Sequence, residues 1–304
     1  MSSQDRATLP EHFAGQEARN QLLAEMPVTE LRLQLAGVST AVLEGGAGPP
    51  IVLLHGPGEF AALWAQVIPD LVKTHRVVAP DLPGHGASGM PDGRLDGDRV
   101  LTWLSELIER TCPSPPVLVG HLLGGAIAAR FASDHSDRLS QVVLVDTFGL
   151  GWNRPALRFA LPLVVYIAHP TERTRDRFLA QCFNDFDGVR ERLGDQFEPL
   201  GDYSLAWTGT KTARAALRSL MPEFGTRGIP QADLARIDVP TTLIHGRHDL
   251  QTRLSVAERA SAQHGWPLHV IEDCRDDPAF EQPEAFLRAL HAAIGTATNA
   301  EPPG

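Results

Sequence analysis

Carboxyl and imidazole side chains recur directly after short apolar runs in this sequence. The candidates are His121, Asp146, His248, Asp249 and Asp276. These two kinds of side chain are the usual proton donors and acceptors in enzymes, so acid/base chemistry is the first function class to consider. That chemistry requires elements which bring the ends of the runs to one place.

Short runs of β-branched and aliphatic residues, each bounded by Gly, Pro or Asp, are spread along the chain. They lie at 51–54, 76–80, 116–120, 141–146, 241–246 and 267–273. A near-continuous apolar run is typical of a strand covered on both faces. Helical patterns at 60–73, 100–110 and 123–132 separate these runs, and two alternating segments at 31–37 and 39–46 indicate an antiparallel hairpin at the edge. We therefore predict an α/β fold with a mostly parallel, eight-stranded sheet and helices on both faces.

The alternation of strand and helix stops between about residues 147 and 235, where charged helical patterns and prolines replace the strands. Because the strand pattern resumes afterwards, we interpret this interval as a helical cap inserted into the core. The predicted domains are an N-terminal extension at 1–27, a core at 28–146 and 236–295, the cap at 147–235 and a flexible tail at 296–304.

Composition excludes several classes of protein. The chain has 304 residues, 43% of them hydrophobic and 21% charged, as in ordinary globular proteins. A net charge of -10 argues against nucleic acid and against an anionic membrane as partners. Three cysteines without metal-ligand spacing, and an N-terminus without an apolar signal core, favour a cytoplasmic protein.

Five strings occur in the order of the α/β-hydrolase superfamily, each after a predicted strand. They are HGPG at 55–58, DLPGHGAS at 81–88, VGHLLGG at 119–125, GRHD at 246–249 and EDCRDDPAFEQPEAF at 272–286. Over residues 28 to 295 the chain resembles the capped subgroup of that superfamily, which includes esterases, epoxide hydrolases and carbon–carbon bond hydrolases. The resemblance implies the same fold, with a pocket at the carboxyl ends of the strands.

The resemblance also locates the nucleophile position, at the centre of Gly120-His121-Leu122-Leu123-Gly124. Leu122 occupies it. Leucine has no lone pair with which to attack a carbonyl, so serine-type covalent catalysis is excluded at this residue. We expect Leu122 to line the floor of the pocket.

Asp276 stands where the superfamily has its catalytic histidine, and Asp249 matches the position of its acid. If the fold is kept, the two carboxyl groups face each other and share a proton, because like charges at short range resist joint ionisation. The alternative is that Asp276 is a surface carboxylate paired with an arginine.

One donor of the superfamily's oxyanion hole follows His-Gly, where this chain has Pro57, which carries no N–H. Gly58 or Glu59 would have to turn inward to replace it. The second donor is the N–H of Leu123.

Three functions stay open. The first is an enzyme without cofactor or metal that performs non-covalent acid/base chemistry on a small apolar molecule, as a lyase, isomerase, cyclase or water-activating hydrolase. In this enzyme, Asp276 acts as acid or base and Asp249 shifts the pKa of Asp276. The pocket candidates are His121, His248, Asp146 and Glu59. The second is a non-catalytic binding protein, and the third an esterase with a displaced nucleophile. A homodimer is possible in each case.

Overall fold

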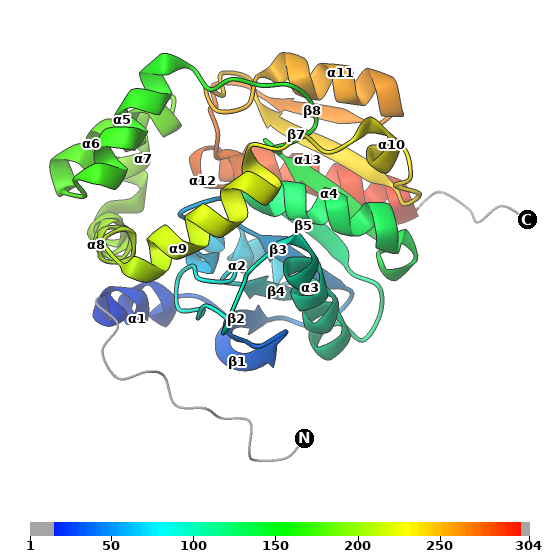
Figure 1. The fold of residues 1–304 in the computed structure, drawn as a ribbon, viewed down its shortest axis with the longest axis horizontal. Helices are drawn as coiled ribbons and strands as arrows, with labels where there is room; N and C mark the ends of the chain where they lie inside the picture. The colour runs from blue at the N-terminus through cyan, green and yellow to red at the C-terminus, as the bar shows by residue number, and fades with distance from the viewer. Residues whose placement is uncertain (1–14, 299–304) are drawn as a thin grey trace, which may run out of the picture.

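The computed structural model describes residues 15–298, and its central element is one mixed sheet (Figure 1). The strand order is β1-β2-β4-β3-β5-β6-β7-β8. The strands are β1 (Thr29–Leu35), β2 (Val38–Gly45), β3 (Pro50–Leu54), β4 (Arg76–Pro80), β5 (Val117–His121), β6 (Gln141–Val145), β7 (Thr241–Gly246) and β8 (Leu268–Ile271). β1 and β2 form an antiparallel hairpin, β2 pairs antiparallel with β4, and the remaining pairs are parallel. The predicted fold class is confirmed.

The central strands are buried on both faces because their side chains alternate between two hydrophobic layers. In β3, Ile51 and Leu53 belong to one core cluster, whereas Val52 and Leu54 belong to the other. The first cluster includes residues of α13 (Pro283–Thr298), and the second includes residues of α3 (Gly97–Thr111) and α4 (Leu123–His135). A continuous apolar run is therefore the pattern that these strands require.

The remaining helices of the sheet-bearing part are shorter. They are α1 (Gln16–Ala24), α2 (Ile68–Leu71), α11 (Leu254–His264) and α12 (Pro278–Glu281). The single helix expected at 60–73 is instead a 3₁₀ turn, Ala61–Gln66, followed by α2. Pro69 lies in the first turn of α2, where its missing N–H has no intrahelical partner to lose.

Between β6 and β7 the chain forms a series of helices that we call the helical insertion. They are α5 (Leu157–Ala168), α6 (Glu172–Cys182), α7 (Phe186–Leu193), α8 (Phe197–Thr208), α9 (Lys211–Leu220) and α10 (Gln231–Leu234). Figure 1 shows α5, α6 and α7 at the outer left of the molecule, and α9 running back toward α4. The domain boundaries drawn from the sequence stay predictions, and most of the expected tail at 296–304 lies outside the described residues.

The first described helix ties the helical insertion to the core. The Arg19 side chain in α1 is fully buried, with its Nε 2.8 Å from Glu30 Oε2 and its Nη1 3.0 Å from Asp81 Oδ2. The same Nη1 donates a 2.9 Å hydrogen bond to the Tyr203 hydroxyl of α8. No helix among residues 15–298 is both long and apolar enough to cross a bilayer.

Candidate active site

The turn between β5 and α4 has the shape of a nucleophile elbow. Leu122 sits at its apex with φ 46° and ψ -105°, a backbone conformation that a branched side chain rarely adopts. The flanking glycines allow the close approach: a Cβ on Gly120 would lie 2.4 Å from Gly124 O, and one on Gly124 would lie 2.4 Å from Leu54 O. The strained turn is therefore present without a side chain that could attack a substrate.

Leu122 does not line the cavity, contrary to our expectation. Its side chain is 1% exposed and belongs to the core cluster that also holds Leu123 and Phe148. The physical reason is that an apolar side chain at the apex gains by packing into the core rather than facing a pocket. Leu123 is likewise fully buried.

A cavity of about 280 Å³ lies beneath the helical insertion. Its walls are mainly aromatic and aliphatic side chains of α5, α6 and α8, including Phe159, Leu163, Phe178 and Trp207. The polar groups that reach it from the core side are few. They are Glu59, Gln251, Asp276 and Asp277. An apolar chamber with a few convergent polar groups is the usual form of a small-molecule site.

Glu59 and His121 form an ion pair at the edge of this cavity. His121 Nδ1 is 3.1 Å from Glu59 Oε2, and His121 Nε2 donates a 2.5 Å hydrogen bond to the backbone oxygen of Asp276. Burial by itself would lower the pKa of His121, but the Glu59 carboxylate, together with Asp277 and Asp146, raises that pKa well above its ordinary value. Burial would likewise raise the pKa of Glu59, and the His121 cation lowers it. The pair is therefore ionised.

Asp276 lines the cavity and is 3% exposed, so the alternative of a surface carboxylate is not what the structure shows. Its Oδ2 accepts a 2.5 Å hydrogen bond from Gln251 Nε2. Among the described residues its Oδ1 has no hydrogen-bond partner although it is buried. Burial, followed by repulsion from Asp249, raises the pKa of Asp276 well above its usual value.

Asp249 is linked to Asp276 through Gln251. The backbone N–H of Gln251 donates a 2.6 Å hydrogen bond to Asp249 Oδ1, while the Gln251 side chain donates to Asp276. Asp249 Oδ2 also accepts hydrogen bonds from the N–H and hydroxyl of Thr252. Burial raises the pKa of Asp249 to about 6. Asp249 is not among the cavity-lining residues, so it influences Asp276 indirectly.

Asp277 lines the cavity, although the sequence analysis did not predict it as a site residue. Its carboxylate accepts a 3.2 Å hydrogen bond from the N–H of Phe280 and so caps α12. Burial raises its pKa to about 7, against the opposing effect of the His121 cation. A carboxyl group that is half protonated at neutral pH is well suited to proton transfer.

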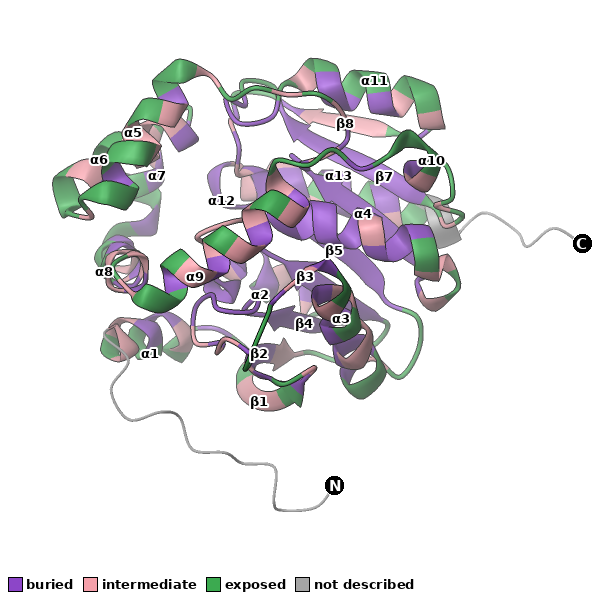
Figure 2. Ribbon diagram, viewed as in Figure 1, coloured by how far each residue is buried: buried purple, intermediate pink, exposed green. Residues whose placement is uncertain are grey.

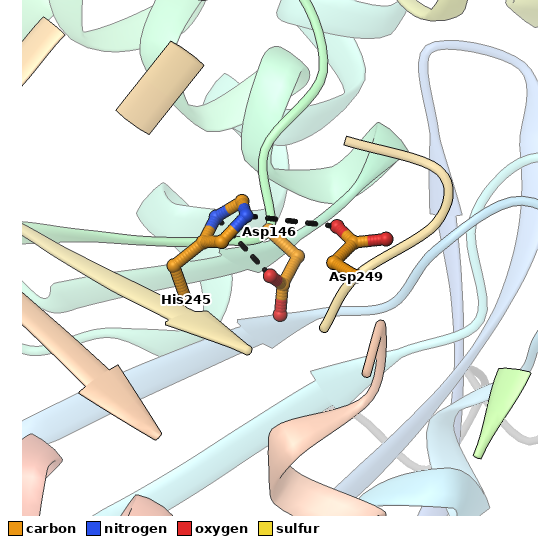
Figure 3. A group of neighbouring side chains, drawn as sticks. All are labelled: Asp146, His245 and Asp249. Atoms are coloured by element: carbon orange, nitrogen blue, oxygen red, sulfur yellow. Dashed lines mark ion pairs between the residues drawn. The ribbon is translucent and has the colours of Figure 1, made fainter. Parts of the chain in front are cut away.

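Asp146, His245 and Asp249 form a second group of ionisable side chains, none of which lines the cavity (Figure 3). His245 Nδ1 is 3.2 Å from Asp146 Oδ1, and His245 Nε2 is 3.8 Å from Asp249 Oδ2. Burial lowers the pKa of His245 to about 4, and burial followed by Asp249 raises that of Asp146 well above its ordinary value. At neutral pH the imidazole is therefore neutral, and burial favours the protonated form of Asp146.

The donor atoms of Asp146, His245 and Asp249 lie within 4.8 Å of one another, as they do in some metal sites. Protein hydrogen bonds already use most of them. Gly246 N–H donates to Asp146 Oδ1, and Thr252 occupies both Asp249 Oδ2 and His245 Nε2. We therefore describe the group as a hydrogen-bonded network.

Some of the remaining predicted residues line the cavity, and the others lie outside it. Pro57 and Gly58 line the cavity, and Gly58 has φ 79° in a turn that closes with a hydrogen bond from Gly56 N–H to Glu59 Oε2. Asp146 is fully buried outside the cavity. His248 was wrong as a pocket candidate, because it follows the end of β7 on the exposed side, with its N–H bonded to Cys274 O.

Sequence reasoning missed Gln251 and Arg175 as well as Asp277. Arg175 lines the cavity from α6, where its Nε contacts Asp176 Oδ1 at 2.9 Å. A Cβ on Gly201 would lie 2.0 Å from Arg175 Nη1, so the glycine makes room for the guanidinium. No short motif marks these residues. The spacing of Arg175, Phe178, Leu179 and Cys182 on one helical face is the one available signal.

Comparison with known proteins agrees with this geometry. The model of the alpha/beta hydrolase family matches residues 51–289. The chain is 30% identical over 250 residues to the 2-hydroxymuconate semialdehyde hydrolase of Pseudomonas sp. strain CF600, covering 79% of this chain and 84% of that protein. It is 29% identical to the pimeloyl-[acyl-carrier protein] methyl ester esterase of Chromobacterium violaceum, covering 83% of this chain and 96% of the esterase.

Among solved structures, the 2-hydroxy-6-oxo-6-phenylhexa-2,4-dienoate hydrolase of Rhodococcus sp. strain RHA1 has a similar fold. The TM-score is 0.76 at 23% sequence identity, and the match covers 88% of this chain and 99% of that one. Sheet order, elbow and family match therefore lead to the same conclusion: the chain belongs to the alpha/beta hydrolase family.

Proposed function

We propose that this protein is an enzyme that moves protons to and from a small apolar carbonyl compound without forming a covalent intermediate. The observation that carries the proposal is the pair of carboxyl groups on Asp276 and Asp277, which share the apolar cavity. Both have raised pKa values, so one can hold a proton at a pH at which the other has released it.

Asp276 is the general acid in this proposal. Its Oδ2 accepts from Gln251, so the proton resides on Oδ1, which has no other partner among the described residues. A protonated carboxyl group in an apolar site can donate a hydrogen bond to a substrate oxygen. Asp276 thereby supplies the donor that the oxyanion hole loses at Pro57, and Asp249 keeps it protonated by charge repulsion.

Asp277 is the general base. Once ionised, it takes a proton from a water molecule while the water oxygen attacks the substrate carbonyl carbon and Asp276 protonates the oxygen. The resulting tetrahedral adduct then collapses: the bond to the leaving group breaks as the carbonyl re-forms, one hydroxyl returns its proton to Asp276, and the proton held by Asp277 passes to the leaving group. The names of the relatives, a semialdehyde hydrolase and a methyl ester esterase, favour hydrolysis over lyase, isomerase or cyclase chemistry.

The Glu59–His121 ion pair positions this machinery. His121 Nε2 holds the backbone of Asp276, and its charge faces Asp277 closely enough to lower the pKa that burial raises. Without that cation, both carboxyl groups would hold their protons more firmly, and Asp277 would be a poorer base near neutral pH.

A binding protein without catalysis is the second candidate, and Leu122 is the observation that favours it. An esterase with a displaced nucleophile ranks third. Cys182 does line the cavity, but burial and the neighbouring Asp276 raise the pKa of its thiol, which disfavours the reactive thiolate.

The test is a panel of apolar semialdehydes, ketones and methyl esters incubated with the purified protein. We expect one class to be hydrolysed without a burst phase and without labelling by a serine-directed fluorophosphonate. The Asp276→Asn and Asp277→Asn variants should each lose turnover but still bind the compound. A compound that raises the melting temperature yet is recovered unchanged would favour the binding protein. Stoichiometric labelling of a serine that abolishes turnover would establish the displaced-nucleophile esterase.

A further inference from the structure

The helix α5 is apolar apart from Arg158, and one of its faces is exposed to solvent. Phe159, Leu163 and Tyr166 line the cavity from its inner face. Its outer face exposes Leu157 at 77%, Leu161 at 64%, Val164 at 63% and Val165 at 46%. These four follow the spacing i, i+4, i+7 and i+8 of one helical stripe. Trp152, 75% exposed, precedes the stripe.

We call this surface the α5 stripe: Trp152, Leu157, Leu161, Val164 and Val165. In Figure 2 the outer edge of the helical insertion, where α5 and α6 lie, is largely coloured as exposed. Scattered single apolar residues on a surface are ordinary, but a continuous stripe of this length marks an interaction surface.

Arginines border the α5 stripe. Arg154 stacks its guanidinium 5.4 Å from the centre of the Trp152 ring, and Arg158 is the one charged residue within α5. On α6, Arg175 and Cys182 face the cavity, so Arg173 and Arg177 lie on the opposite, exposed side of that helix. Within residues 15–298, none of Arg154, Arg158, Arg173 and Arg177 makes an ion pair with a carboxylate.

This local charge is opposite to that of the whole chain. The segment 152–178 carries five arginines and two acidic residues, whereas the chain has a net charge of -10. The expectation of no membrane partner came from the net charge, which does not describe this face. An apolar stripe with an indole and flanking guanidinium groups fits the interfacial region of an anionic bilayer.

A second copy of the chain fits the stripe less well. A two-fold symmetric contact would place the same patch on both sides and bring arginines toward arginines. Anionic headgroups would neutralise these cations, and the acyl chains would cover the leucines and valines.

We propose that the α5 stripe docks the protein on an anionic lipid surface, with the cavity wall against the membrane. Because the same helix lines the cavity, docking would bring the cavity next to the source of an apolar substrate. The inference concerns how such a molecule reaches the cavity and does not depend on the reaction performed there.

The test is cosedimentation of the full chain with two kinds of vesicle. One contains phosphatidylcholine and phosphatidylglycerol in equal parts, and the other contains phosphatidylcholine alone. We expect binding to the anionic vesicles only, weakened by added salt. Leu161→Asp should reduce it about tenfold, since it removes apolar area and adds a repelled charge. Thr102→Asp, an exposed position on α3, is the matched control and should leave binding unchanged.

The double variant Arg154→Glu/Arg158→Glu tests the charge, with Arg259→Glu/Arg288→Glu as the control of equal charge change. Only the first should lose binding, by about tenfold or more. Circular dichroism and thermal unfolding verify that the variants fold. Absence of binding to anionic vesicles, or equal binding to both kinds, overturns the proposal. So does a dimer in light scattering that Leu161→Asp dissociates, because the stripe would then be occupied by a second copy.

Discussion

Two buried histidines of this protein, each in contact with a carboxyl group, hold different charges. His121, beside the cavity, lies 3.1 Å from Glu59, and its pKa is raised well above the ordinary value. His245, which does not line the cavity, lies 3.2 Å from Asp146, and its pKa is lowered to about 4. Both rings are 3% exposed, so the degree of burial does not distinguish them.

The partner explains the difference. Glu59 reaches the partly open cavity and has a pKa below its usual value, so it meets His121 as an anion. Asp146 is fully buried and is repelled by Asp249, so its pKa is raised, and burial lowers the pKa of His245. An imidazole in the interior is charged only where the neighbouring carboxyl group is ionised.

The largest expected effect is on activity, and it distinguishes Asp276, which lines the cavity, from Asp249, which does not. Asp276→Asn should lower kcat about 10²- to 10⁴-fold, because the amide cannot transfer a proton. Asp249→Asn should have a smaller effect, since Asp249 acts only by raising the pKa of Asp276. The measurement is turnover of whichever compound the panel identifies. Equal losses in both variants would mean that Asp249 takes part directly.

The second prediction compares the partners of the two histidines through stability at neutral pH. Glu59→Gln should reduce the free energy of unfolding by about 3 kcal/mol, because it leaves the buried His121 cation without its counter-ion. Asp146→Asn should cost under about 1 kcal/mol, because the raised pKa of Asp146 shows that its site disfavours the charge that the amide removes. Urea denaturation of both variants measures the two values. Similar losses would show that both pairs are ionised.

The third prediction uses pH. The folded-state pKa of Asp277 is about 7, above its ordinary value of 3.8, so the native protein binds more protons than the unfolded chain between these values. Raising the pH through this window therefore destabilises the wild type through Asp277. Asp277→Asn removes the contribution, and asparagine still caps a helix. Above pH 7 the variant should be more stable than the wild type by about 1–2 kcal/mol, and the gain should vanish toward pH 4.

Thermal or urea unfolding across this pH range provides the measurement for Asp277→Asn. Asp238→Asn, at an exposed residue, is the control for the loss of one carboxyl group. A gain for Asp277→Asn that persists unchanged at pH 4 would contradict the raised pKa.

The smallest effect is expected at the elbow. Leu122→Ser should not create esterase activity above the background hydrolysis of 4-nitrophenyl esters, because the base position holds Asp276 and Pro57 withholds a donor. The double variant Leu122→Ser/Asp276→His is the fairer trial, since Asp249 matches the acid position that the resemblance implies and is linked to residue 276 through Gln251. Substantial activity in the single variant would reveal a base and an oxyanion hole elsewhere.

Local sequence patterns were sufficient for the sheet. Its runs of apolar residues, such as 51–54, are required because successive side chains enter two different core layers. The elbow was also readable, since Gly120 and Gly124 permit a backbone approach that a Cβ would block. The helix expected at 60–73 was less accurate, because the sequence pattern does not separate a 3₁₀ turn and a short helix from one continuous helix.

The cavity lining was predictable only in part. Glu59 and Asp276 were found through the resemblance, whereas Gln251 and Arg175 belong to no motif. His248 and Leu122 were expected at the cavity and lie outside it, because His248 is exposed beyond the end of β7 and Leu122 packs into the core.

The sequence by itself determined that the elbow of this member of the family carries leucine and not serine, because the identity of Leu122 is a covalent fact that no folding can change. Tertiary structure alone decided which acidic residues hold protons. Asp146, Asp249, Asp276 and Asp277 have the same side chain, and in water they would titrate alike. Their pKa values diverge because burial and the charges of residues distant in sequence, such as His121, act on each of them differently.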